Sequence, residues 1–491
     1  MTSIISSLSI TQIKSLSTAT IASFTSDDVA ALSSAQVAAL SSKQISAFLT
    51  DDFDQLDATQ LSAISSAAIR GLTIDQLSVI DSAKMTALSS RQLGALTSTQ
   101  MTALTSEQFA ALTTGQLASL SSAALSGLQT DDIATLTSAE LAVISTRALS
   151  GLSTANFATL DSTQLSGLTS GQIAALSTAA IAILTSDQID GLDASQISAL
   201  NSRQIAALST DALASFSTDQ IVALNSRALS VLKSTQVAAL STDQIGVLTT
   251  GQLASLTSTA VAGLGTDDVA ALSSDGVAAL SSRTLAALST TNFAALGSGQ
   301  LVGLTSAKIA GLTAAQIGVL SSDQVDGLTP GQIAGLTSAQ MNALTADTLA
   351  SFSTDQVGAL SSRAIGVLNS TKVAALSSDQ VAALSTLQLA SLSSAAVKGL
   401  ETEDLATFTS TELAALNSRA LAALSTDNIA SLTSAQLTAL SSAQIASLTE
   451  AGPLEPAPDV IIAPAALEPA LASTYPNAIF RLYPLRSGMP V

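Results

Sequence analysis

Large apolar residues recur at every eighth position of this chain without any change of phase. From Leu8 to Leu448, every residue at this spacing is Leu, Ile or Phe, without exception. The residue three before it, from Ile13 to Ile445, is always large and apolar as well. We number each octad so that these residues are positions 5 and 8. Because residues three apart lie on one face of a helix, each octad predicts one short amphipathic helix.

The polar residues mark where each helix begins. Position 1, from Ser9 to Thr449, is in most octads Ser or Thr, and Asp, Asn or Gly fill nearly all of the others. These residue types are the preferred helix N-caps. Position 4 is most often Gln, which completes the capping-box pattern with position 1. Four residues at position 1 do not fit, and we expect the weakest caps there: Leu49, Gln129, Lys233 and Glu401.

The spacing also separates this interpretation from its rivals. A continuous α-helix would rotate the apolar stripe by about 80° per octad, so that it faced no constant partner. A flat strand would place positions 5 and 8 on opposite faces. A helix shorter than ~12 residues is marginal alone, so its stability must come from stacking on its neighbours. We predict an all-α repeat solenoid of very short capped helices, forming an elongated rod over residues 1–449, with two to four octads per coil. A β-solenoid and disorder are the alternatives left open.

The only proline before residue 453 lies within this array, in Leu328-Thr-Pro-Gly-Gln-Ile-Ala-Gly-Leu336. In the octad frame Thr329 is the cap and Pro330 is the first helical residue. At that position the missing N–H costs nothing and the fixed φ suits a helix. The proline therefore predicts a helix start and not a break.

A second period, seventeen octads long, is superimposed on the first. Arg91, Arg227 and Arg363 keep this spacing, as do Arg147, Arg283 and Arg419. Segmental duplication explains the period, and a structural period or a lattice of partner contacts is the alternative. Asp and Arg residues one octad apart, such as Asp355 and Arg363, are expected to pair at the surface.

Composition excludes several classes of function. The net charge of −19 disfavours nucleic acid and anionic lipid as partners. With no His and no Cys, the chain lacks the usual general base, the thiolate nucleophile and the imidazole or thiolate metal ligands. We therefore predict no enzyme activity, no catalytic residues, no cofactor and no metal site. No apolar run approaches the ~20 residues that span a bilayer, and no Sec-type signal peptide is recognisable.

The octads end at Leu448, and residues 450–491 are different. This segment holds eight of the nine prolines and both tyrosines. Its first part is typical of an extended linker. Its second part is apolar and aromatic, with Tyr475, Phe480 and Tyr483 as candidate anchors for a protein partner. The alternatives are that it covers the last coil or that it is an uncleaved export signal.

The octad L-[ST]-[ST]-x-Q-[IVL]-x-A resembles the octad-repeat arrays of large bacterial secreted and surface proteins. The resemblance covers residues 8–448 and implies a structural role at the cell surface or outside the cell, while a cytosolic location stays open. We expect a rigid solenoid subunit that associates end to end with copies of itself into a filament or surface structure. The alternatives are a monomeric spacer or stalk of an adhesin, or a length-setting ruler whose C-terminal tail binds a partner. Binding of an ordered surface such as ice or glycan through the hydroxyls is a weaker option.

Overall fold

The computed structural model describes residues 4–449, which contain 52 α-helices, four 3-10 helices and no strand. Every full octad holds one of these short helices, and nearly all of them span only one or two turns. The prediction of an all-α array with one short helix per octad is confirmed.

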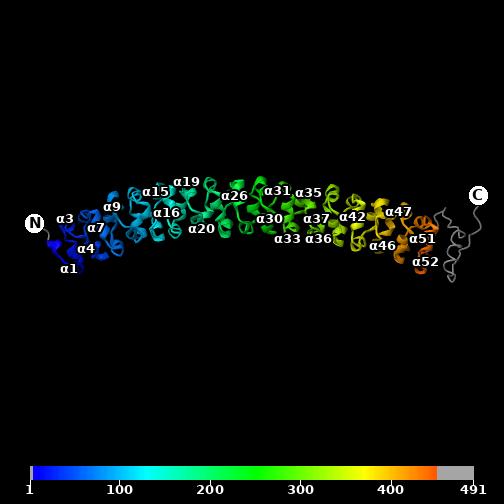
Figure 1. The fold of residues 1–491 in the computed structure, drawn as a ribbon, viewed down its shortest axis with the longest axis horizontal. Helices are drawn as coiled ribbons and strands as arrows, with labels where there is room; N and C mark the ends of the chain where they lie inside the picture. The colour runs from blue at the N-terminus through cyan, green and yellow to red at the C-terminus, as the bar shows by residue number, and fades with distance from the viewer. Residues whose placement is uncertain (1–3, 450–491) are drawn as a thin grey trace, which may run out of the picture. The chain divides into compact units, whose positions relative to one another are not determined.

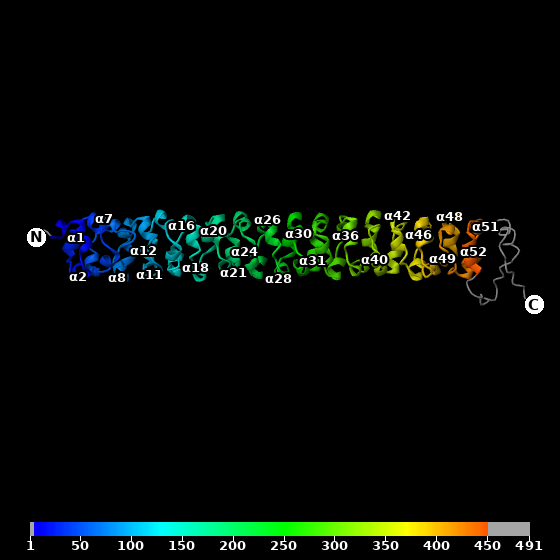
Figure 2. The same cartoon turned by 90° about the horizontal axis from the view of Figure 1, so that it is seen from below.

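The helices belong to two compact units, Met1–Ser255 and Leu256–Val491. In each unit they follow one another in chain order (Figures 1 and 2). The described elements of the first unit are η1 (Ile4–Ser7), α1 (Ile10–Ser15), α2 (Thr18–Ile21), α3 (Ser26–Ala30), α4 (Ser34–Ala38), α5 (Ser42–Ile45), α6 (Thr50–Phe53), α7 (Ala58–Ala63), η2 (Ile69–Gly71), α8 (Ile74–Ser78), α9 (Ser82–Ala87), α10 (Ser90–Leu93), α11 (Ser98–Thr102), α12 (Ser106–Ala110), α13 (Thr114–Leu117), α14 (Ser122–Leu125), α15 (Thr130–Thr135), α16 (Ser138–Val143), α17 (Thr146–Leu149), α18 (Thr154–Ala158), α19 (Ser162–Ser166), α20 (Ser170–Ala175), α21 (Thr178–Ala182), α22 (Ser186–Asp190), α23 (Ala194–Ser198), α24 (Ser202–Ala207), α25 (Thr210–Ala214), α26 (Thr218–Ala223), α27 (Ser226–Leu229), α28 (Ser234–Val237), α29 (Thr242–Gly246) and α30 (Thr250–Ser255).

The described elements of the second unit are η3 (Ala260–Gly263), α31 (Thr266–Ala271), α32 (Ser274–Ala279), α33 (Ser282–Ala286), α34 (Thr290–Ala294), α35 (Ser298–Val302), α36 (Ser306–Ala310), α37 (Ala314–Gly318), α38 (Ser322–Asp326), α39 (Pro330–Ile333), α40 (Ser338–Ala343), α41 (Ala346–Ala350), α42 (Thr354–Ala359), α43 (Ser362–Ile365), α44 (Ser370–Ala374), α45 (Ser378–Ala382), α46 (Thr386–Ser391), η4 (Val397–Gly399), α47 (Thr402–Thr407), α48 (Ser410–Ala415), α49 (Ser418–Leu421), α50 (Thr426–Ala430), α51 (Ser434–Thr438) and α52 (Ser442–Thr449).

One packing rule holds in both units: each helix packs against the helix of the third octad along the chain. In the first unit α11 contacts α14, and in the second α37 contacts α40 and α43 contacts α46. One coil of the solenoid therefore contains three octads, within the two to four that the sequence allowed.

The core consists of the two apolar positions of each octad. Leu93 at position 5 is 0% exposed and Leu96 at position 8 is 2% exposed. Burial of this kind stabilises by about 1.5–3 kcal/mol per large side chain, which a lone octad could not obtain. The two apolar positions thus do face one interior, as their spacing predicts.

The helix starts are built as the polar pattern predicts. The Thr105 side chain accepts a hydrogen bond from the amide of Gln108, and the Gln108 side chain accepts one from the amide of Thr105. At the four unsuitable residues, Leu49, Gln129, Lys233 and Glu401, no side-chain cap is formed. Three of these four keep half of the box, because position 4 still accepts the position-1 amide, as between Gln129 and Asp132 at 3.0 Å.

The proline also lies where the octad frame places it. Pro330 begins α39, Thr329 is its N-cap with φ −72° and ψ 154°, and Gln332 closes the capping box.

One surface expectation is wrong: no ion pair joins Asp355 to Arg363 within the described residues. None of the helices in residues 4–449 is long and apolar enough to cross a membrane.

Candidate functional site

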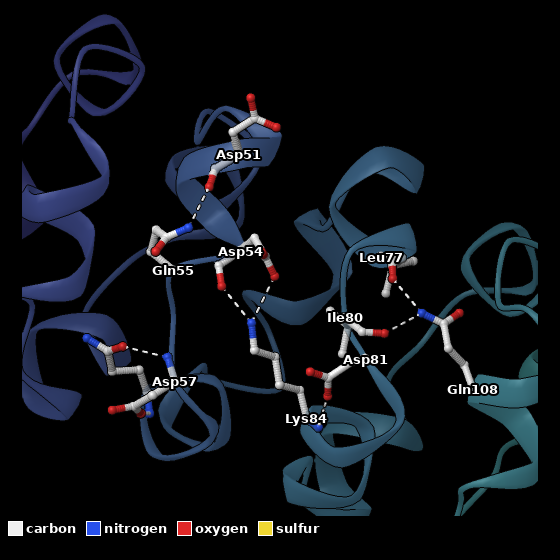
Figure 3. Close-up of polar contacts among 10 residues, drawn as sticks. Asp51, Asp54, Gln55, Asp57, Leu77, Ile80, Asp81, Lys84 and Gln108 are labelled. Atoms are coloured by element: carbon white, nitrogen blue, oxygen red, sulfur yellow. Dashed lines mark hydrogen bonds and ion pairs between the residues drawn. The ribbon is translucent and has the colours of Figure 1, made fainter.

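The glutamine at position 4 makes the contacts that join one coil to the previous one. In α12, Nε2 of Gln108 donates to the carbonyl oxygens of Leu77 at 2.8 Å and Ile80 at 2.6 Å (Figure 3). These acceptors are positions 5 and 8 of the octad four before its own. Oε1 of the same amide accepts from the Thr105 amide at 2.8 Å. One side chain therefore caps its own helix and ties that helix to the previous coil.

This arrangement repeats along both units with the same spacing in sequence between donor and acceptors. Gln204 donates to Ile173 and Leu176 at 2.9 and 3.0 Å, for example, and is only 1% exposed. We call the position-4 glutamines that make these bonds the glutamine ladder. Among the described residues no buried side-chain nitrogen or oxygen lacks a hydrogen-bond partner. The position-5 carbonyl also accepts the position-8 amide of its own octad, as Leu77 does from Ile80 at 3.2 Å. Removal of one ladder amide would therefore take the partner from the buried position-8 carbonyl, at a cost of about 1–3 kcal/mol.

The sequence interpretation assigned these glutamines only to capping and missed the bonds between coils. A signal was present in the choice of residue. Gln is by far the commonest residue at position 4 between Gln12 and Gln444, whereas only Glu140 and Glu412 are Glu. Either residue type completes a capping box, but only the amide has N–H groups left to donate. The excess of Gln over Glu therefore indicates that these side chains have a second role as hydrogen-bond donors.

Lysine replaces glutamine at position 4 in three octads and fulfils the same donor role. Nζ of Lys84 lies 2.6 Å from the carbonyl of Asp54 and 2.9 Å from its carboxylate, as Figure 3 shows. Lys308 donates to the carbonyl of Ala278. The third is Lys372. An ammonium group can replace the amide because the acceptors are helix C-terminal carbonyls, which favour positive charge.

Lys372 is the most buried of the three, at 8% exposure. Its Nζ donates to the carbonyls of Met341 and Asn342, both at 2.8 Å. Burial lowers the pKa of Lys372 from its ordinary value, because the charged form is desolvated. Position 4 of this octad thus holds an ammonium group that is less well solvated than it would be in water.

We expect Lys372→Gln to stabilise the second unit by about 0.5–1.5 kcal/mol, the net value of an ordinary hydrogen bond, since an amide fills the site without a charge. With a folded-state pKa below the unfolded value near 10.4, the folded protein binds fewer protons in the window between the two values. The free energy of unfolding of the unchanged protein should therefore rise with pH through that window. At pH values below the window it should stay constant at its lower value. Urea unfolding from neutral pH to about pH 10.5 measures both effects. A pH dependence that is the same in Lys372→Gln would contradict this role.

Aspartate at position 4 makes a different contact between coils. The Asp132 carboxylate accepts from Oγ of Ser106 at 3.0 Å, and Asp404 accepts from Oγ of Ser378 at 2.9 Å. A carboxylate has no N–H to donate to the carbonyls that the ladder satisfies elsewhere. Coils that meet through Asp are therefore joined without the ladder bonds.

The first described coil presents an unused ladder donor. Gln12 in α1 accepts the Ser9 amide at 2.8 Å, but its Nε2 has no partner among residues 4–449. Ile4 and Ile10, in the same part of the chain, are 79% and 39% exposed. Near the other end of the array, the carbonyls of Leu421 and Leu424 have no ladder glutamine, because residue 452, four octads on at position 4, is a glycine. The Leu421 carbonyl still accepts the amide of Leu424 at 3.2 Å.

The predicted partner anchors Tyr475, Phe480 and Tyr483 lie outside the described residues, so their role stays a prediction. Within residues 4–449, no three His, Cys, Asp or Glu side chains are grouped closely enough to hold a metal ion.

No curated protein matches this chain. The family model of the ALTTAQ repeat matches more than half of it, and the letters A-L-T-T-A-Q correspond to positions 7, 8, 1, 2, 3 and 4 of the octad. That hexapeptide contains the core leucine, the helix cap and the ladder glutamine. The matched residues are 5–42, 77–114, 168–202, 192–226, 222–250, 229–258, 248–282, 293–330, 306–338, 349–386, 397–434 and 421–450. The chain therefore belongs to the ALTTAQ repeat family.

Proposed function

We propose that this protein is a non-enzymatic structural protein whose solenoid associates end to end with copies of itself into a filament or surface structure. The ladder carries this proposal. Each coil offers carbonyl acceptors to the coil that follows and sends amide donors to the coil that precedes. Such a face is complementary to the opposite face of another coil of the same kind, and stacking of solenoid ends extends the array.

The two ends of the array support this association through hydrogen bonding. Gln12 has a donor without a carbonyl partner in the described residues, and Leu421 and Leu424 have carbonyls without a ladder glutamine four octads on. A second copy stacked on the last coil places a donor of the Gln12 type over acceptors of this type. The exposed Ile4 and Ile10 add apolar surface to the same contact.

The distribution of charge along the chain also supports end-to-end association. Lys14 is the only charged side chain among residues 1–26, and Asp427 is the only one among residues 420–449. Most of the net charge of −19 therefore resides elsewhere, and the end coils do not repel each other strongly. The two ends instead carry single charges of opposite sign.

The resemblance to octad arrays of bacterial secreted and surface proteins supports placing such an assembly at the cell surface or outside the cell. Under this proposal the partner of the array is a second copy of the chain. Residues 450–491, with Tyr475, Phe480 and Tyr483, supply a further contact with a protein partner.

Sedimentation velocity and negative-stain electron microscopy of the full chain, over a range of protein and salt concentrations, test the proposal. We expect assemblies that grow with protein concentration. The double variant Ile10→Lys with Gln12→Glu keeps the capping oxygen but removes the donor and the apolar contact, and should weaken association at least tenfold.

Leu387→Lys is the matched control, because Leu387 is 75% exposed on α46, which belongs to neither end coil. It should assemble like the unchanged protein. A single monomeric species at every concentration would overturn the proposal and favour a spacer or stalk instead. Equal loss of assembly in Leu387→Lys would place the contact on the flank of the solenoid.

A further inference from the structure

The glutamine ladder is interrupted in three blocks of five consecutive octads, residues 121–160, 257–296 and 393–432. The blocks are spaced seventeen octads apart, and elsewhere no more than two successive octads lack Gln at position 4. The position-4 residues of the three blocks are Ala124, Asp132, Glu140, Ala148 and Asn156; Ala260, Asp268, Gly276, Thr284 and Asn292; and Ala396, Asp404, Glu412, Ala420 and Asn428. The second period of the sequence is therefore a period in the ladder.

Within a block, most of the ladder bonds are lost, although in the second block the Thr284 hydroxyl still donates to the carbonyl of Leu256 at 3.1 Å. Alanine at position 4 has no polar side-chain atom, and the Glu140 carboxylate accepts only from its own cap, Thr137. Asn156 is one methylene shorter than Gln and reaches one carbonyl, that of Leu128 at 2.7 Å. The equivalent Asn428 makes the same single bond, to Leu400 at 2.8 Å. Four successive octads of the first block thus send no ladder bond to the previous coil, and the fifth sends one.

The interruption extends around the whole solenoid. A coil contains three octads, so five octads cover more than one full turn. The bonds that remain between coils in the first block include Ser106 to Asp132 at 3.0 Å and Gln129 to Thr102 at 3.0 Å. The amide that makes the second of these bonds is solvent-exposed. Water competes for such a bond, whereas it does not reach the buried ladder amides.

In the first and third blocks, the first octad lies close against the backbone of the previous coil. In every block this octad combines Ala at position 4 with Gly at position 7, namely Gly127, Gly263 and Gly399. A Cβ atom added to Gly127 would lie 2.1 Å from the carbonyl oxygen of Ser98, and one added to Gly399 would lie 2.1 Å from that of Ser370. Two further octads with Ala at position 4 are as close to their neighbours, at Gly71 and Gly151. Close approach of this kind also occurs beside a ladder glutamine, since a Cβ added to Gly191, in the octad of Gln188, would lie 2.5 Å from the carbonyl oxygen of Ser162.

We propose that the three blocks are joints, one in each seventeen-octad repeat, at which neighbouring coils separate first. Stiffer ladder segments, such as residues 161–256 and 297–392, lie between them. The second compact unit begins at Leu256, directly before the second block. The joints do not depend on how the protein assembles. The proposal of joints and the proposal of end-to-end association can therefore be tested independently.

Hydrogen exchange of the full chain, followed by mass spectrometry, tests the joints in a single sample. Exchange of the core amides at positions 5 and 8 reports coil separation. We expect these amides to exchange at least tenfold faster in all three blocks than in residues 161–256 and 297–392. Uniform exchange along the array would overturn the proposal.

Two matched variants test the cause. Asp132→Gln with Glu140→Gln installs ladder donors in the first block, and should slow its exchange while the second and third blocks stay unchanged. Gln188→Ala with Gln196→Ala removes two ladder donors from α22 and α23 and replaces them with alanine, which also occurs at position 4 within the blocks. This double variant should create a new fast-exchanging segment. If installing donors leaves the first block fast and removing them leaves α22 and α23 slow, the ladder does not control opening and the proposal fails.

Discussion

Replacing Ile333 by proline should destabilise the second unit by at least ~3 kcal/mol beyond the loss of its side chain, although Pro330 is accommodated three residues earlier. The Ile333 amide donates to the carbonyl of Thr329 at 3.1 Å, a bond that proline removes. Its ring would also clash with that same carbonyl. Pro330 avoids both penalties because it is the first residue of α39.

Two controls separate the backbone effect from the side-chain effect. Ile333 is 0% exposed, so Ile333→Ala costs about 2–5 kcal/mol through the cavity alone. Ala346→Pro places proline at the first residue of α41, where we expect a change within about 0.5 kcal/mol or a slight gain. Urea unfolding followed by circular dichroism compares the three. If Ile333→Pro were no worse than Ile333→Ala, the assignment of one helix start per octad would be wrong.

Gly127→Ala should destabilise the first unit by about 1–3 kcal/mol or more, although it adds a single methyl group. The added carbon would lie 2.1 Å from the carbonyl oxygen of Ser98 and 2.8 Å from its Cα. Both atoms belong to backbone, so no side-chain rotation relieves the overlap. The two stacked octads must move apart, and their shared core opens with them.

Gly115→Ala is the matched control within the same unit. Gly115 lies inside α13, and a Cβ there would meet no atom within 4 Å. This substitution should stabilise by about 0.5–1 kcal/mol, because alanine loses less backbone entropy than glycine in a helix. Thermal unfolding of the two variants should therefore shift in opposite directions. A shift of the same sign in both would show that conformational freedom, and not close stacking, explains Gly127.

The helix starts and the core were predictable because both depend on residues within one octad. Thr329, Pro330 and Gln332 lie within one turn of each other, and their capping geometry follows from local bonding alone. Likewise, positions 5 and 8 share a face of any helix regardless of what lies opposite. Local rules also identified the residues that could not cap, such as Leu49 and Glu401.

Only one of the two roles of the ladder glutamines was predicted from the sequence. Sequence reasoning found the ladder glutamines as caps, because their Oε1 bonds a residue three positions away. It missed their Nε2 bonds, because the acceptors lie four octads earlier, as Leu77 and Ile80 do for Gln108. The surface pairing of Asp355 with Arg363 failed for a related reason. Proximity by one octad along the chain does not place two side chains together when the coil stacks every third octad.

By itself, then, the sequence determined that the chain forms short capped helices with one apolar face and that it cannot use imidazole or thiol chemistry. Only the tertiary structure decided that three octads make a coil, where each ladder amide donates, and which glycines lie against backbone. An octad has the same internal pattern whatever the size of the coil. The choice among coils comes from the packing and hydrogen bonding of octads three and four places apart, and no pattern within a single octad contains that distance.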